Sequence, residues 1–174
     1  MLMRIVMLLA AVLTAACAGG RGAVSIPGVP GVTIPRAVAS ALSDRWNGWQ
    51  IVAPGAEAAE CASRFSAPPS AVATGDWNGD GTTDLAFQIA APDGRRIVAA
   101  FARLDGEYLV FEVTPVPDTG GVLGVERKAG PYRQQADGVV HYYSLDTIAF
   151  GACHNSEMVY FWNGTTFDGR AVFE

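Results

Sequence analysis

Short apolar runs separated by turn residues fill the second half of the chain. Runs of this length between glycine- or proline-containing turns are typical of antiparallel strands. We therefore expect strands over 84–91, 95–104, 107–113, 122–127, 139–143, 146–150, 157–162 and 167–173. Pro92-Asp93-Gly94, Asp105-Gly106 and Asn163-Gly164 are expected to form hairpin turns, because glycine supplies the positive φ that a tight turn requires.

The run over 157–162 is apolar on both faces. Met158, Tyr160 and Trp162 alternate there with Val159 and Phe161. A strand of this kind is buried on both sides, so it predicts either a central strand or a strand with one face covered by the N-terminal helix.

One helix is expected ahead of the strands. Pro35 suits a first helical position and Gly48 suits a helix end. Between them, an apolar face is formed by Val38, Ala41, Leu42 and Trp46. Residues 53–73 fit a short helix and a loop equally well, and residues 128–138 are polar and predict a loop. The predicted fold class is α+β: an antiparallel β meander with one N-terminal helix packed against it, as a single domain over residues 35–174.

The most informative segment is 76–84. Asp76, Asn78, Asp80 and Asp84 stand at positions 1, 3, 5 and 9 of a loop, and Gly81 stands at position 6. Hard oxygen donors at alternate positions around a glycine turn form the first half of a calcium loop. The position-7 ligand would be the backbone carbonyl of Thr82.

The rest of the segment departs from an EF-hand. Phe87 stands at position 12, where an EF-hand needs a bidentate Glu, and the residues that follow the loop predict a strand rather than a helix. The alternative interpretation is a turn without metal, because Asp, Asn and Gly favour turns by themselves.

The segment 75–85, Gly-Asp-Trp-Asn-Gly-Asp-Gly-Thr-Thr-Asp-Leu, resembles the FG-GAP repeat, also called the VCBS or integrin-α-like repeat, with its pattern D-x-[DN]-x-D-G-x-x-D-[LI]. The resemblance implies calcium bound in a strand–loop–strand, with Asp76, Asn78, Asp80, the Thr82 carbonyl and Asp84 as ligands. The chain holds one copy of the motif, whereas the family's propellers need several. In this respect it resembles small bacterial envelope proteins that carry a single such loop.

The N-terminus has the pattern of an export signal. Arg4 precedes a short apolar run over 5–13, which ends in Thr14-Ala15-Ala16-Cys17. Such a run is too short to span a bilayer permanently. Small residues ahead of Cys17 resemble a lipobox, in which the chain is cut before a cysteine that receives a diacylglyceryl group. The alternative is ordinary cleavage further on, for example after Ala18, which would give a free secreted protein.

The expected organisation follows from this pattern. Residues 1–16 are a signal peptide, and residues 17–34 are a lipid-anchored, Gly/Pro-rich tether that lifts the domain from the membrane. Ala18, rather than Asp, follows the lipidated cysteine, which resembles the sorting pattern of outer-membrane lipoproteins. The predicted location is the bacterial cell envelope.

Lipidation of Cys17 leaves Cys61 and Cys153 as the one possible intramolecular pair. Export permits a disulfide between them. It would close a loop of about 90 residues, worth about 4–5 kcal/mol in a chain-entropy description. Two buried free thiols are the alternative.

Charge restricts the partners. The whole chain carries a formal net charge of −5, and removal of residues 1–16 deletes one Arg and no acid, which gives −6. A mildly acidic chain argues against nucleic acid and against anionic lipid as partners.

The sequence contains no recognisable catalytic motif, and His141 and His154 lack metal-ligand spacing. We therefore expect a non-enzymatic accessory or binding module of the envelope, with a protein or polysaccharide partner. One alternative is an enzyme acting on envelope polymers, whose site residues the sequence does not connect. The aromatic residues of 142–143 and 160–162 are a candidate ligand surface, although strands are enriched in aromatic residues anyway. Another is a periplasmic hydrolase inhibitor that presents the loop 128–138.

Overall fold

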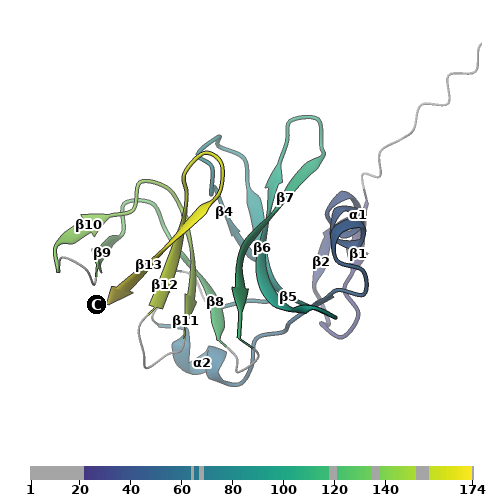
Figure 1. Ribbon diagram of the computed structural model, residues 1–174, viewed down its shortest axis with the longest axis horizontal. Helices are drawn as coiled ribbons and strands as arrows, with labels where there is room; N and C mark the ends of the chain where they lie inside the picture. Colours follow the sequence, from purple (N-terminus) through teal and green to yellow (C-terminus); the bar gives the residue numbers. More distant parts are fainter. Residues whose placement is uncertain are drawn as a thin grey trace, which may run out of the picture.

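A computed structural model of the protein describes residues 22–63, 65–66, 69–117, 121–134, 138–151 and 157–173. Figure 1 shows three layers: a helix with a small hairpin, a first β-sheet beside it, and a second β-sheet on the far side. All strand pairs are antiparallel. The α+β prediction, antiparallel sheet with a helix near the N-terminus packed against it, is confirmed.

The outer layer consists of β1 (Ala23–Ser25), β2 (Thr33–Pro35) and α1 (Arg36–Arg45). The helix begins at Arg36, one residue after the predicted first position at Pro35, which ends β2 and caps the helix, and Val38 and Leu42 are its buried residues. The helix packs against β7, β2 and β1.

The described part of the predicted tether belongs to the folded domain, so that prediction is corrected from Gly22 onward. Ile26, Val29 and Ile34 are buried in the core beneath α1. Gly28 and Gly31 have φ of 79° and 78°, which turns the chain between β1 and β2. The Gly/Pro content therefore serves a tight hairpin rather than a flexible linker, and the domain begins ahead of residue 35.

The first sheet has the strand order β3-β5-β6-β7, and β4 also pairs with β5. Its strands are β3 (Gln50–Ile51), β4 (Ala73–Gly75), β5 (Asp84–Ala91), β6 (Gly94–Ala102) and β7 (Tyr108–Val116). β5 has the predicted bounds. β7 continues past the predicted end at residue 113 and includes Pro115, which is tolerated because β7 is the edge strand and needs no N–H there. The ambiguous segment 53–73 contains a short helix, α2 (Glu57–Cys61).

The second sheet has the order β10-β9-β13-β12-β11-β8. Its strands are β8 (Val122–Glu126), β9 (Pro131–Gln134), β10 (Val140–Tyr142), β11 (Thr147–Gly151), β12 (Glu157–Trp162) and β13 (Phe167–Phe173). β9 lies in the segment 128–138 that was predicted as a loop, so the loop prediction is wrong for these four residues. It pairs with both β10 and β13.

The main core lies between the two sheets and includes Trp77, Ile97, Phe101, Ile148 and Tyr160. A second core lies between the first sheet and α1. β12 is a central strand, one of the two predicted alternatives, because it pairs with β11 and β13. Val159 lies in a third cluster, on the face opposite Tyr160, and α1 covers the other sheet instead.

No helix among the described residues is long and apolar enough to cross a membrane.

Candidate metal centre

The acidic loop, residues 76–84, joins two neighbouring strands. β4 ends at Gly75 and β5 begins at Asp84, and these two residues are paired across the strands. The strand–loop–strand arrangement that the FG-GAP resemblance implies is therefore present around the predicted ligands.

Asp76 organises the first turn of the loop. Its Oδ1 accepts the backbone N–H of Gly79 at 2.8 Å, and its Oδ2 accepts the N–H of Gly81 at 3.1 Å. Both glycines have positive φ, 79° and 82°, a conformation that a side chain makes unfavourable. The sequence places glycine at the two positions where the chain must curve around Asp76.

Asn78 and Asp80 each form a turn in which the side-chain oxygen accepts the backbone N–H of the residue two positions ahead. Asn78 Oδ1 accepts the N–H of Asp80 at 3.0 Å, and Asp80 Oδ1 accepts the N–H of Thr82 at 2.7 Å. The Asn78 amide also donates to Asp80 Oδ2 at 3.0 Å. The Thr82 N–H and then the Asn78 amide lower the pKa of the Asp80 carboxyl below its ordinary value.

Asp84 closes the loop from inside the protein. The residue is 0% exposed, and its carboxylate accepts the N–H of Trp77 at 3.2 Å and the N–H of Ala102 at 2.9 Å. Burial raises the pKa of Asp84 to about 6. The charges of Asp80 and Asp76 also raise this pKa, whereas the hydrogen bonds from Ala102 and Trp77 lower it. The three carboxylates of the loop are thus close enough to repel one another.

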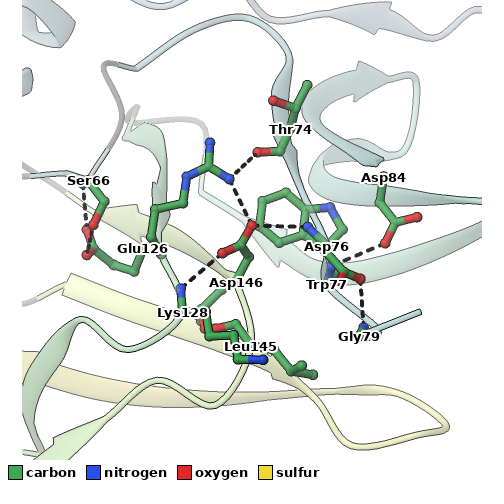
Figure 2. A network of polar contacts seen from close by, with 12 residues as sticks. Ser66, Thr74, Asp76, Trp77, Gly79, Asp84, Glu126, Lys128, Leu145 and Asp146 are labelled. Atoms are coloured by element: carbon green, nitrogen blue, oxygen red, sulfur yellow. Dashed lines mark hydrogen bonds and ion pairs between the residues drawn. The ribbon is translucent and has the colours of Figure 1, made fainter. Parts of the chain in front are cut away.

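A fourth acid, Asp146, fixes the loop to the second sheet (Figure 2). Its Oδ2 accepts the backbone N–H of Asp76 at 3.1 Å and the Arg127 guanidinium at 2.8 Å, and its Oδ1 accepts the N–H of Lys128 at 3.0 Å. Arg127 also donates to the carbonyl of Thr74 at 3.1 Å. Burial alone would raise the pKa of Asp146, but the hydrogen bonds from Lys128 and Asp76 and the Arg127 charge lower it overall.

Apolar contacts seat the loop as well. Trp77 is fully buried between the sheets, and its ring would lie 2.3 Å from a Cβ added at Gly75. Leu145, next to Asp146, would lie 2.8 Å from a Cβ added at Gly79. A side chain at Gly75 would displace the Trp77 ring, whereas Leu145 meets Gly79 with the flexible end of its side chain, so glycine is favoured at position 79 mainly by its positive φ.

The donor set fits calcium in its chemistry. The loop offers three carboxylates, the Asn78 amide oxygen and the Thr82 carbonyl, all hard oxygen donors. A carboxylate has about four lone-pair sites, so a hydrogen bond from the backbone leaves room for a metal contact. Within the described ranges, however, no three or more His, Cys, Asp or Glu side chains gather closely enough to hold an ion as they stand. An ion held by all three carboxylates would therefore need them to lie closer together than they do here.

The loop is open to solvent along one side. A shallow groove of about 440 Å³ is lined by Asn78 and Asp80 and by residues 101–105 and Leu109 of the β6–β7 hairpin. Asp80 is exposed in this groove.

Of the other predicted site residues, the structure describes Cys61 and His141. Cys61 is fully buried, whereas Cys17, Cys153 and His154 lie outside the described residues. The ring of His141 stacks on Tyr132 with centroids 5.4 Å apart.

The predicted aromatic ligand surface does not form as one face. Tyr160 and Trp162 pack between the sheets, while Tyr143 and Phe161 lie together on the outer face of the second sheet, with centroids 5.8 Å apart. Strand alternation divides the 160–162 run between two faces. Tyr142 is exposed, away from Tyr143.

Sequence reasoning did not identify Asp146 or Arg127. Nothing near them in the chain resembles a metal or catalytic motif, and the loop that they hold is 70 residues away from Asp146. No family model, no curated protein and no solved structure matches this chain.

Proposed function

We propose that the chain is a lipoprotein of the bacterial cell envelope, anchored through a lipid on Cys17, in which the acidic loop binds one structural calcium ion. The observation that carries the metal site is the burial of Asp84. A fully buried carboxylate stands at the end of a loop that also holds Asp76 and Asp80. The charges of Asp80 and Asp76 contribute to the raised pKa of Asp84, and a cation bound in the loop would offset this repulsion.

Asp76, Asn78, Asp80, Asp84 and the Thr82 carbonyl would hold the ion. Calcium supplies positive charge that offsets the repulsion, and it accepts six to eight oxygen ligands in flexible geometry. Five protein donors, with no Glu at position 12, leave the remaining positions to water.

The role of such an ion is structural. The loop is held by hydrogen bonds that join β4, β5, β6 and the start of β11, through Asp84 and Asp146. An ordered loop therefore stabilises the contact between the two sheets. This favours a non-enzymatic accessory or binding module that is stabilised by calcium outside the cytoplasm, with a protein or polysaccharide partner.

Isothermal titration calorimetry of the metal-free mature chain tests the site. We expect one calcium per chain with a Kd of about 10⁻⁴–10⁻³ M, the range of extracellular modules. Magnesium should bind more weakly, because it demands octahedral geometry at short distances.

Asp80→Ala should abolish calcium binding while the circular dichroism spectrum is retained, since Asp80 is exposed. Asp105→Ala is the matched control, because Asp105 is an exposed acid of the same groove outside the loop. Equal binding by both variants, or no binding by the wild type at millimolar calcium, would show that the loop is only a turn.

A further inference from the structure

The point at which the chain enters the folded domain is fixed. The backbone carbonyl of Gly22 accepts the N–H of Arg36, the first residue of α1, at 2.7 Å. Gly22 follows Cys17 by five residues. A fully extended chain spans at most 3.3–3.6 Å per residue, so Gly22 lies within about 17 Å of a lipid on Cys17.

The layer that holds this entry point forms one outer side of the molecule. α1, β1 and β2 lie on one flank of the first sheet, and the second sheet lies on the opposite flank (Figure 1). Val38 and Leu42 point from α1 toward the first sheet, while Ser40, on the opposite face of the helix, is exposed.

Charge is divided between this layer and the rest of the chain. After removal of residues 1–16, residues 17–45, which include the whole layer, contain three arginines and one acid, Asp44, a formal net charge of +2. The remaining residues hold eight basic and 16 acidic side chains, a formal net charge of −8. Arg36 is exposed beside Gly22, and none of the ion pairs between described residues involves it.

We propose that the layer of β1, β2 and α1 rests against the lipid bilayer, with Arg36 facing anionic headgroups and the second sheet facing away. This inference rests on the proposed lipid at Cys17. Basic residues are attracted to an anionic leaflet within about a Debye length, and acidic surfaces are repelled from it. The whole-chain charge of −5 argued against anionic lipid as a partner. It is, however, the sum of a positively charged N-terminal layer and a negatively charged remainder.

Distance-dependent quenching tests the orientation. The full-length lipoprotein would carry p-azidophenylalanine in place of Ser40 or Thr165, coupled to a fluorophore, and would be reconstituted into vesicles of phosphatidylethanolamine and phosphatidylglycerol. Both positions are exposed, but Thr165 lies between β12 and β13 of the second sheet. With nitroxide-labelled headgroups, we expect strong quenching at position 40 and little at position 165. Equal quenching, or stronger quenching at position 165, would overturn the proposal.

The anchor is checked separately by intact mass. If Cys17 carries no lipid, the proposed anchoring fails, and a chain that begins at Cys17 is instead prepared, coupled through this cysteine to a maleimide phospholipid and measured in the same way. The difference between positions 40 and 165 then still decides the orientation.

A charge reversal tests the role of Arg36. Arg36→Glu should reduce the quenching at position 40 on vesicles with phosphatidylglycerol and leave it unchanged on phosphatidylcholine alone. Arg170→Glu, an exposed arginine of the second sheet, is the matched control and should change neither. An equal effect of the two variants would remove the headgroup contact from the proposal.

Discussion

Asp146 Oδ2 accepts the backbone N–H of Asp76 at 3.1 Å and joins two loops that lie 70 residues apart in the chain. The bond belongs to a network in which Arg127 and the Lys128 N–H also donate to Asp146 (Figure 2). The acidic loop, which closes one end of the first sheet, is in this way attached to the start of β11 in the second.

Asp146→Ala should lower the free energy of unfolding by about 2–3 kcal/mol, because it leaves the Asp76 and Lys128 N–H groups without their charged acceptor. Urea unfolding at neutral pH measures the change. Asp93→Ala is the control, because Asp93 is exposed and its partner Arg96 keeps a second ion pair with Glu112, so the removal of Asp93 should cost less than about 1 kcal/mol. Similar losses for the two variants would contradict the role assigned to Asp146.

Asp84 should make the metal-free protein less stable as pH rises from about 4 to about 6. The ordinary pKa of an Asp carboxyl is 3.8, and the fold raises that of Asp84 to about 6, so between these values the folded state keeps a proton that the unfolded state has released. The free energy of unfolding is then highest below the lower pKa and falls through the higher one, by at most about 3 kcal/mol.

Urea unfolding in chelator across this pH range measures the slope, and Asp84→Asn should flatten it. Asp80 and Asp146, whose pKa values are lowered, act in the opposite direction at pH values below 3.8. A wild-type free energy of unfolding that stays level or rises from pH 4 to 6 would contradict the raised pKa of Asp84.

Much of the strand pattern was predictable, because its signals are local. β5 has the predicted bounds since turn residues flank an apolar run, and Gly94 and Gly164 have the positive φ expected in their hairpins. β9 was not predicted because Pro131 to Gln134 have no apolar face. They form a strand because they pair with β10 and β13.

The remaining errors concern relations between distant residues. Ile26, Val29 and Ile34 are buried only because α1 and the first sheet cover them, so composition alone suggested a tether. The five acidic-loop positions were predictable from a local motif. Asp146 was not, because its partners Asp76 and Lys128 come from different sheets and no local pattern relates them.

Cys61 and Cys153 should form a disulfide in the exported protein. Cys61 is buried in a cluster with Val122, and Val122 is paired with Gly151, two residues before Cys153. Intact mass of the non-reduced mature chain should be two hydrogens below that of the reduced chain, and reduction should lower the melting temperature. Alkylation of both thiols in the unfolded but non-reduced protein would disprove the bridge.

Cys17→Ser should remove the lipid and release the protein from the membrane fraction, because Cys17 is the predicted acceptor. Metabolic labelling with a fatty acid and fractionation of the envelope measure both effects. The variant keeps the entire domain from Gly22 onward, so its circular dichroism spectrum should match that of the wild type. Unchanged membrane partitioning would mean that Cys17 is not the anchor.

The most direct test of the calcium site is the melting temperature of the wild type in calcium and in chelator. An ion that binds only the folded state stabilises it by about 2.7 kcal/mol at a hundredfold excess over Kd, which corresponds to a rise of about 5–10 °C for a domain of this size. We expect this rise in melting temperature for the wild type and for Asp105→Ala, and no rise for Asp80→Ala. A wild-type melting temperature that is the same in calcium and in chelator would contradict it.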